Sequence, residues 1–502
     1  MRLKEWRRLL GLDAADQASA EIAAAVPDNR FSETFARSVR HNVIAEITIQ
    51  ILRIGGMIVL ARALRPQDFG LLKVLLAVST VIVILCEAGL PEALVQRSEL
   101  TQNHEATARW VSFGPAGLCV TALYGVAPAI ADLMVMPNLG FALRLLCLPI
   151  LIEATSGISN ARLRRGLNFG SLALADALAE AAFLGTCLLL VANGEALWSL
   201  AGGLSARYVV HGLTVWVLGG RPAHGWPRMA DLRILWRFSF SIFTGRILTT
   251  ISNNVDYLLV GRFLGSEILG FYGMAWDLLR FVEARVHNTL GRVAISAFSR
   301  LQDDNLKLRN AYREFSGYLA RLVIPMMACI ALAAPELIGT VYGPRWYAAV
   351  VPLRILSAGL SLTALRSASV AVYYAKNQPA LDVYLNGFRT LLVGVAVVSL
   401  LSLRLPGISV GVSMAEAVIS IVGASLACSL VGLNLRILAA VCLPATRLAA
   451  LCALVILASK AVAQFAALQG PSTLVLVVVP VGVVFYWLAA NDFNRFLSMS
   501  FN

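Results

Sequence analysis

The chain has 502 residues, of which 58% are hydrophobic and 14% are charged, and its formal net charge is +13. Soluble domains are about 25% charged, so a mean hydropathy of +0.74 excludes a soluble fold of this length and makes lipid the solvent. The Lys and Arg residues are scattered between apolar runs, without a basic block and interleaved aromatics, which argues against nucleic acid as a partner.

The cysteines do not suggest a disulfide framework or a metal site. All eight lie inside apolar runs, none forms a CxxC pair, and the five His residues are scattered. We therefore expect small buried hydrophobic side chains at these positions, and no metal.

Residues 1–40 form a basic N-terminal segment that we place in the cytoplasm. Asp13, Asp16 and Glu21 interrupt any apolar core, so the segment is not a signal peptide. Two interpretations stay open, a short amphipathic helix lying on an anionic membrane surface and a disordered tail.

From residue 42 onward, apolar runs arrive at regular intervals, most near the roughly 20 residues that a bilayer core requires. The eighth run is the least regular, because three charged residues occupy its second half. The pattern predicts fourteen transmembrane helices, at 43–63, 70–93, 108–132, 139–158, 171–192, 197–218, 238–261, 267–283, 317–341, 348–372, 381–403, 408–432, 441–463 and 472–490.

The Arg and Lys residues gather in alternate loops. One set of loops holds the cluster Arg162, Arg164 and Arg165 and continues to Lys376, whereas the other set holds few, such as Arg345. Positive residues favour the cytoplasmic side, and the basic N-terminus belongs to the rich set. Both termini are therefore expected in the cytoplasm.

A stretch at 59–70, VLARALRPQDFG, returns at 259–270 as LVGRFLGSEILG, which sets Arg62 on Arg262 and Gly70 on Gly270. We expect these four residues to form a structural motif at the membrane rim. Six spans separate the copies, so both halves cross the membrane in the same direction, as parallel repeats do. The fold class that follows is an all-α integral membrane protein, with two parallel-repeat six-helix bundles around a central cavity and two further C-terminal helices.

The expected domains follow from this count. They are a cytoplasmic segment at 1–40, a first bundle at 41–220, a cytoplasmic linker at 221–237, a second bundle at 238–435, and two extra helices with a short cytoplasmic tail at 436–502.

Charged residues inside spans cost about 2.5–3.5 kcal/mol each at the bilayer centre, so they favour a bundle interior or a wet cavity. Charges within a turn of a span end, such as Asp176, Arg354 and Arg389, have snorkelling to the interface as the alternative. The charges inside spans also include Glu153, Glu180, Arg366 and Glu416. The deeper ones, which we select as candidate substrate-cavity residues, are Arg53, Glu87, Arg144, Arg207, Arg246 and Asp256.

Five motifs carry a resemblance to a known family. They are LARALRPQDFG, EAGLPEALVQR at 87–97, ARLRRGLNF at 161–169, NNVDYLLVGRFLGSEILGFY at 253–272 and VYGPRWYAAVVPLRILSAG at 341–359. In this order they resemble the polysaccharide-transport family of the multidrug/oligosaccharidyl-lipid/polysaccharide exporter superfamily, in its colanic-acid-exporter-like branch.

The resemblance implies a flippase of the bacterial cell inner membrane, not an enzyme, with no catalytic residue. Its cargo would be undecaprenyl-pyrophosphate-linked oligosaccharide, moved by alternating access for exopolysaccharide, capsule or lipopolysaccharide assembly. Arg forks in a cationic cavity would hold the phosphates. Membrane lipid, a polymerase and other polysaccharide-assembly proteins are the implied partners, and the chain is expected to be a monomer without a cofactor.

Asp256 closes the stretch Asn253-Asn254-Val255-Asp256, which is similar to an Asn-x-x-Asp pattern in the family's seventh helix. Proton or sodium coupling through Asp256 and a helix-pairing salt bridge both stay open. Two other functions are also considered. A multidrug antiporter of the superfamily would favour an acidic cavity, and a polysaccharide polymerase would need a sizeable non-cytoplasmic loop.

Overall fold

The computed structural model describes residues 49–50, 52–97, 101–220 and 226–465, and within these ranges the chain is helical throughout, without a strand. In this described part, nine helices are long and apolar enough to cross a membrane. The predicted class, an all-α membrane protein, is confirmed. The N-terminal segment at 1–40 and the last predicted span at 472–490 lie outside the described residues.

The chain divides into two compact units. Unit 1 is Met1–Leu64 with Leu75–Ile247, and unit 2 is Arg65–Val74 with Leu248–Asn502. The division therefore falls inside two helices, α4 (Pro66–Glu87) and α10 (Met229–Arg300), each of which contributes to both units.

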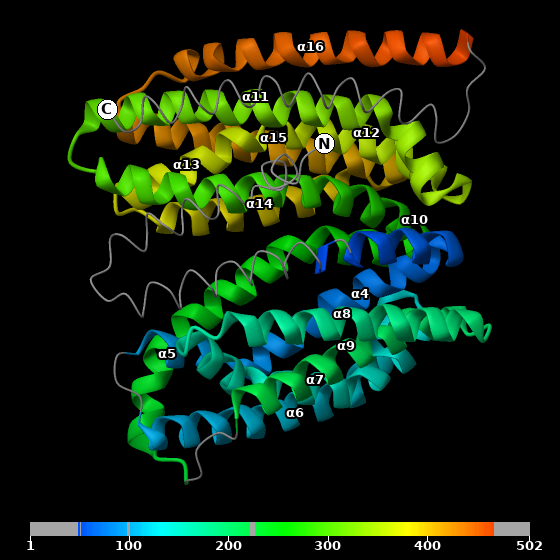
Figure 1. Ribbon diagram of the computed structural model, residues 1–502, viewed down its shortest axis with the longest axis vertical. Helices are drawn as coiled ribbons and strands as arrows, with labels where there is room; N and C mark the ends of the chain where they lie inside the picture. Colours follow the sequence, from blue (N-terminus) through cyan, green and yellow to red (C-terminus); the bar gives the residue numbers. More distant parts are fainter. Residues whose placement is uncertain (1–48, 51, 98–100, 221–225, 466–502) are drawn as a thin grey trace, which may run out of the picture. The chain divides into compact units, whose positions relative to one another are not determined.

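Unit 1 is built on four long helices that run side by side (Figure 1). Helix α7 packs against α6 and α9, and α8 packs against α9. The helices of this unit are one at 52–63, the later part of α4, α5 (Leu90–Gln96), α6 (Gln102–Met134), α7 (Pro137–Arg165), α8 (Phe169–Ala192), α9 (Ala196–Gly219) and the first part of α10.

Capping residues and a proline mark the starts of three helices of unit 1. Thr101 and His104 form a capping box at α6, in which each side chain accepts a hydrogen bond from the other residue's backbone N–H. Asn168 caps α8 through the N–H of Ser171. Pro137 opens α7, where its missing N–H has no intrahelical partner to lose.

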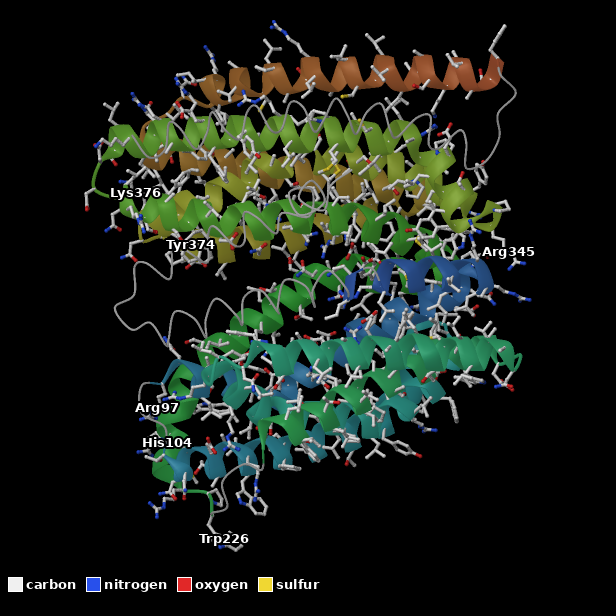
Figure 2. The ribbon with its side chains drawn as sticks, in the orientation of Figure 1. Arg97, His104, Trp226, Arg345, Tyr374 and Lys376 are labelled. Carbon is white, nitrogen blue, oxygen red and sulfur yellow. The ribbon has the colours of Figure 1, made fainter. Side chains whose placement is uncertain are left out.

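Many of the outward side chains are apolar, as lipid requires. Leu118 of α6 is 73% exposed and Val217 of α9 is 79% exposed. In water such a surface would be unfavourable, whereas in a bilayer it is the ordinary outer face of a bundle. Figure 2 shows the polar side chains Arg97 and His104 together at one end of unit 1.

The second predicted span, 70–93, is wrong as a continuous helix. Helix α4 ends at Glu87, and Ala88 and Gly89 take left-handed φ values of 48° and 73° before α5 begins. Gly89 permits this conformation, and its missing side chain also admits the Ser239 carbonyl oxygen of α10. Pro91 then fits the first turn of α5.

Unit 2 packs its helices around α15 and α11 (Figure 1). Helix α15 contacts α12, α13 and α14, and α11 contacts α12, α13 and α16. The elements are the second part of α10, α11 (Asn305–Leu337), η1 (Ile338–Tyr342), η2 (Pro344–Ala349), α12 (Val350–Leu360), α13 (Thr363–Ala375), α14 (Ala380–Ser399), η3 (Leu401–Leu403), α15 (Arg404–Val431) and α16 (Leu435–Phe465).

Two predicted features of this half are refined. Gly265, with φ 86° and ψ 173°, breaks α10 between the seventh and eighth predicted spans. The tenth predicted span, 348–372, is divided between α12 and α13. Figure 2 shows Arg345 and Lys376 at opposite ends of unit 2, as their assignment to opposite sets of loops requires.

Helix α16, one of the two extra C-terminal helices, is fixed to unit 2 by charge as well as by packing. Lys460 Nζ lies 2.8 Å from Glu336 Oε1 of α11 and donates a 2.7 Å hydrogen bond to the Leu332 carbonyl oxygen. A paired Lys costs far less in lipid than a single one, which explains why this span carries it.

The two copies of the repeated stretch touch each other inside unit 2. A Cβ on Gly70 would overlap the backbone carbonyl of Ser266, and a Cβ on Gly270 would overlap that of Pro66. Pro66 and Ser266 are themselves equivalent under the 200-residue offset. The contact is therefore reciprocal, with each glycine receiving the backbone of the other copy.

A buried tryptophan covers this reciprocal contact. Trp346, from η2, is fully buried and meets Phe69 edge-on at 5.1 Å and Phe271 at 6.1 Å between ring centroids. Such edge-to-face pairs add about 0.5–1.5 kcal/mol beyond area burial. Three of the motifs that carry the family resemblance thus meet at one place.

We expect Gly270→Ala to lower the folded yield and melting temperature of the detergent-solubilised protein. The new methyl group meets backbone, which cannot turn away as a side chain can, so the loss should reach or exceed the about 1–3 kcal/mol of ordinary overpacking. Gly394→Ala in α14 is the matched control, because nothing lies within 4 Å of its Cβ position. Equal stability of the two variants would contradict the close approach.

Candidate functional site

Unit 2 contains a polar pocket of about 310 Å³, called here the arginine pocket. Helix α10 supplies one wall, α13 and α14 supply a second, and α15 closes it. Three arginines face two glutamates across it, so its formal charge is positive. The lining residues are Asn253, Trp276, Arg280, Glu283, Ala284, Arg366, Asn386, Arg389 and Glu416.

Arg389 and Glu416 form a buried ion pair at the base of this pocket. Arg389 Nη2 lies 2.5 Å from Glu416 Oε1, and both side chains are 4% exposed. Arg389 Nη1 also donates to the Ser252 carbonyl oxygen at 2.6 Å, so one guanidinium joins α14, α15 and α10. The interpretation of Arg389 as a snorkelling residue is wrong, because its charge is satisfied inside the bundle and not at the interface.

Arg280 and Arg366 are held differently. Their hydrogen bonds go to the side-chain oxygens of Asn253 and Asn386, each at 3.5 Å, the outer limit for such a bond. In the described part of the chain neither has a carboxylate within ion-pair distance, and both are half-buried. Their guanidinium groups therefore present several N–H donors to the pocket.

Asp256 lies in the same unit, fully buried. Its Oδ2 accepts a 2.8 Å hydrogen bond from the Tyr272 hydroxyl, which ties together the two parts of α10 on either side of Gly265. The Tyr272 ring stacks on Trp276, and Arg280 lies over Trp276 with 5.1 Å to the ring centroid. Asp256 thus supports the wall that positions Arg280 through its hydrogen bond to Tyr272, and among the described residues no cation lies within ion-pair distance of its carboxylate.

A second charge pair, between a buried lysine and a half-buried aspartate, stands beside the reciprocal glycine contact. Lys73 of α4 pairs with Asp277 of α10, and Asp277 also accepts a 3.2 Å hydrogen bond from the Tyr257 hydroxyl. The aliphatic part of the Lys73 side chain packs against Gly273, the residue equivalent to Lys73 in the second copy, where the missing side chain leaves room for it. The pair explains how the eighth span tolerates Asp277.

Unit 1 carries a separate network that is rich in carboxylates. Arg246 of α10 lies 2.8 Å from Glu87 at the end of α4 and 2.8 Å from Glu92 of α5, so it bridges the break at Gly89. Gly157 of α7 leaves room for Glu87, whose Oε1 would lie 3.2 Å from a Cβ there.

Glu180 of α8 is the centre of a second group in this network. Arg53 approaches it at 3.4 Å and Arg207 at 3.8 Å, and the Glu180 side chain is only 4% exposed while both arginines are more than one-third exposed. Because Arg53 and Arg207 share the single Glu180 carboxylate and are both half-exposed, some of their N–H donors remain directed toward the exposed side of the unit.

His211 of α9 completes the network between two further carboxylates. Its Nδ1 lies 2.9 Å from Glu153 Oε2 of α7, and its Nε2 lies 3.6 Å from Asp176 Oδ1 of α8. Arg207, one turn earlier on α9, is a cation close enough to oppose a positive charge on the imidazole. A neutral imidazole can donate to one of these carboxylates, and only the protonated ring donates to both.

The structure brings some of the six selected residues together and separates others. Glu87 pairs with Arg246, Arg53 and Arg207 share Glu180, and Asp256 stands in unit 2. Arg144 joins none of these groups; it is exposed, lies over the Tyr124 ring at 5.0 Å and donates to the Tyr124 carbonyl at 3.2 Å. Whether these residues line one path stays a prediction.

The repeated arginines are both on the surface of their units. Arg62 is exposed, and Arg262 is exposed with its guanidinium 5.8 Å from the Phe263 ring centroid. Gly70 and Gly270 are buried at the reciprocal contact. The structural role of the glycines is thereby visible, and that of the arginines stays a prediction.

Sequence reasoning passed over Arg280, His211 and Lys73 as site residues. Arg280 stands one helical turn after Trp276, a spacing that predicts the cation–ring contact that the structure has. The assignment of Arg389 to within a turn of a span end is also wrong on the sequence alone, because it stands more than two turns inside 381–403, a depth that disfavours snorkelling. Lys73 lies within the second predicted span, where a charge is itself a signal for a buried partner.

The comparisons with known proteins agree with this architecture. Residues 59–351 match a family described as polysaccharide biosynthesis protein. The chain is 26% identical over 343 residues to the teichuronic acid biosynthesis protein TuaB of Bacillus subtilis (strain 168), with 68% of this chain and 70% of TuaB covered. It is 23% identical over 384 residues to the lipopolysaccharide biosynthesis protein WzxC of Escherichia coli (strain K12), with 75% of each covered.

A solved structure shares the fold. The lipid II flippase MurJ, in an inward closed conformation, superposes with a TM-score of 0.70 at 14% identity, over 91% of this chain and 99% of MurJ. At that identity the likeness shows the fold alone.

Glu416→Leu should lower the unfolding free energy by about 3–5 kcal/mol, because Arg389 is left buried without its carboxylate. The double variant Arg389→Met/Glu416→Leu should recover most of this loss, since no buried charge is then unpaired. Thermal unfolding in detergent measures both, with Glu283→Leu at the half-buried rim of the same pocket as the control. A double variant no more stable than the single one would contradict the buried pair.

Proposed function

The chain belongs to the polysaccharide biosynthesis protein family and is a multi-pass membrane protein, and on this basis we propose that it is a flippase for lipid-linked oligosaccharides. The proposed cargo is the undecaprenyl-pyrophosphate-linked repeat unit, carried across the bacterial inner membrane for exopolysaccharide, capsule or lipopolysaccharide assembly. The proposed orientation puts both termini and the Arg-rich loops in the cytoplasm.

The observation that carries this proposal is the state of Arg280 and Arg366. Both guanidiniums stand in a polar pocket with only distant amide oxygens as hydrogen-bond partners among the described residues. A cation without a carboxylate is costly within a bilayer and is retained where it meets an anionic ligand. Planar guanidinium forks match two adjacent phosphate oxygens, and a pyrophosphate offers several such pairs.

The neutral groups of the pocket suit the sugar end of this cargo. Asn253 and Asn386 line the pocket beside the arginines, and Trp276 offers an aromatic face. Amide groups both donate and accept, so they can replace water around hydroxyl groups that would otherwise lose their hydrogen bonds. The polyprenyl chain needs no polar site because it can stay in lipid.

The rival functions fit these groups less well. A multidrug antiporter for cationic drugs would be opposed by three arginines in the pocket. A polymerase would make glycosidic bonds and would require a positioned acid and base. Of the two glutamates that line the pocket, Glu416 is ion-paired with Arg389 and Glu283 is half-buried at the rim, so they do not form such a pair.

We expect Arg280→Ala and Arg366→Ala to abolish export while leaving a folded protein in the membrane. Neither guanidinium lies within ion-pair distance of a carboxylate in the described structure, so its removal breaks no direct ion pair. Cells should accumulate the finished lipid-linked repeat unit on the cytoplasmic side, measured by labelling it with and without membrane permeabilisation. Arg280→Lys and Arg366→Lys should retain part of the transport, because lysine keeps the positive charge but lacks the planar, bidentate guanidinium group.

Arg354→Ala is the matched control, since this arginine of α12 is exposed and donates to the Ala331 carbonyl, away from the pocket. It should export normally. The proposal fails if the pocket variants leave a finished repeat unit facing the periplasm without polymerisation, because that outcome indicates a polymerase.

We further propose that a proton couples to transport through His211 in unit 1. The imidazole faces Glu153 and Asp176, with Glu180 and Arg207 one turn away on α8 and α9. Protonation adds the second N–H, so it strengthens the attraction that draws α7, α8 and α9 together. Asp256, for which the sequence leaves both proton or sodium coupling and a helix-pairing role open, is enclosed and bonded to Tyr272.

In proteoliposomes, wild-type translocation should change with pH between about 5.5 and 7.5, the range in which histidine changes charge. His211→Gln retains a hydrogen-bonding side chain that cannot be charged, so its rate should be flat over this range. Glu195→Gln, at the exposed start of α9, is the control and should follow the wild type. A pH response preserved in His211→Gln would place the coupling proton elsewhere.

A further inference from the structure

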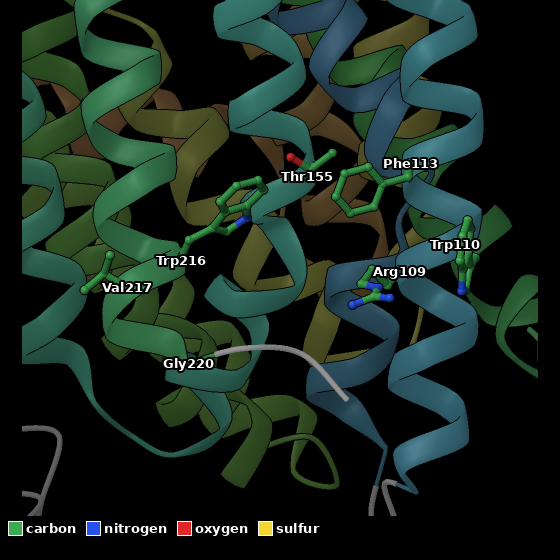
Figure 3. Close-up of a pocket in the computed structure, with 7 residues that line it drawn as sticks. All are labelled: Arg109, Trp110, Phe113, Thr155, Trp216, Val217 and Gly220. Atoms are coloured by element: carbon green, nitrogen blue, oxygen red, sulfur yellow. The ribbon is translucent and has the colours of Figure 1, made fainter. Parts of the chain in front are cut away.

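Unit 1 has a second cavity, of about 610 Å³, that contains none of the residues discussed so far as a site. It lies between α6 and α9, with α7 as its floor. Figure 3 shows Phe113 and Trp216 turned toward each other across it, with Thr155 of α7 behind them and Arg109 near one end. We call it the α6–α9 groove.

The walls of this groove are apolar and open to the outside. Phe113 is 40% exposed, Trp216 is 36% exposed and Trp110 is 45% exposed. The Thr155 hydroxyl is already used, since it donates to the Leu151 carbonyl at 2.8 Å. A hydrated solute gains little from such walls, whereas a hydrocarbon chain from the bilayer fits them.

One end of the groove is cationic. The Arg109 guanidinium lies 5.9 Å from the Trp110 ring centroid, and among the described residues it pairs with no carboxylate. At Gly220, which also lines the groove, an added Cβ would lie 3.7 Å from Arg162 Nη1. Glu105 takes part of the Arg162 charge at 3.5 Å, which leaves Arg109 as the open donor.

The segment that precedes α10, residues 226–228, holds the wall beside Arg109 in place. Trp110 stacks on Trp226 with ring centroids 5.9 Å apart and an interplanar angle of 3°, and the Arg228 N–H donates to Thr107 of α6 at 3.1 Å. Tryptophan is enriched at the boundary between hydrocarbon and head groups, and arginine side chains extend their charge to it.

We propose that the α6–α9 groove binds an anionic phospholipid of the surrounding leaflet. One acyl chain lies between Phe113 and Trp216, and the glycerophosphate group accepts hydrogen bonds from Arg109. Basic pockets between transmembrane helices select anionic head groups in this way. In the groove an apolar part, between Phe113 and Trp216, leads to a cationic end at Arg109, just as in a phospholipid an acyl chain leads to a phosphate. This inference does not depend on the proposed cargo.

The test uses the purified full chain and two probes with identical acyl chains, palmitoyl-oleoyl phosphatidylglycerol and palmitoyl-oleoyl phosphatidylcholine. Native mass spectrometry counts the retained lipids and gives their apparent affinities. The phosphatidylglycerol should bind more tightly, and Arg109→Gln should weaken it about tenfold while leaving the phosphatidylcholine unchanged. Arg109→Lys should retain most of the preference, and Trp216→Ala should weaken both lipids.

Arg144→Gln is the matched control, because Arg144 is an exposed arginine of the same unit whose contacts lie with Tyr124. Lipid-free melting temperatures confirm that each variant is folded. Three results would overturn the proposal. They are equal binding of the two lipids, an equal loss in Arg109→Gln and Arg144→Gln, and displacement of the phosphatidylglycerol by equimolar undecaprenyl phosphate, which would make the groove a site for polyprenyl chains.

Discussion

The backbone-to-backbone contact between the two copies of the repeated turn is the constraint on which the rest of unit 2 depends. Gly70 and Gly270 each admit a carbonyl group of the other copy, and no other residue type leaves that space. The contact fixes how the start of α4 lies against α10. Trp346 then packs on Phe69 and Phe271, so the junction of α11 and α12 takes its position from the same contact.

From this contact a continuous series of interactions leads to the arginine pocket. Lys73 binds Asp277, which accepts a hydrogen bond from Tyr257; the Tyr257 ring meets Tyr272, and Tyr272 stacks on Trp276 beneath Arg280. Along this series Lys73 is paired with Asp277, and the Tyr257 and Tyr272 hydroxyls each donate a hydrogen bond to a carboxylate, as a bilayer interior requires. Arg280 can therefore be left without a carboxylate, because its helix is positioned by other groups and not by its own charge.

The sequence predicts the class of fold well and the site only in part, for a physical reason. Apolar run length predicts a transmembrane helix because lipid thickness is fixed, and the repeat by itself identifies Gly70 and Gly270 as equivalent positions. The pairs that make the site lie far apart in sequence, such as Arg246 with Glu87 and Arg389 with Glu416. Membrane helices are apolar on nearly every face, so their periodicity does not tell which face a charge occupies. The break at Gly89 is missed for a related reason, since apolar composition continues across it.

The two units carry opposite kinds of charge, and this bears on how a transporter of this fold could couple them. The unit 1 network sets five carboxylates against three arginines and one histidine, which favours uptake of a proton, whereas the arginine pocket of unit 2 favours an anion. Two ligands influence each other only when both bias one conformational equilibrium. The elements available for this are α4 and α10, because the chain divides within both. Helix α4 ends at Glu87, just before Gly89, and α10 is broken at Gly265 between Asp256 and Tyr272; both glycines have positive φ. Polar contacts span both glycines, Asp256 with Tyr272 across Gly265 and Arg246 with Glu87 and Glu92 across Gly89, so a change in charge at these groups acts directly on the two breaks.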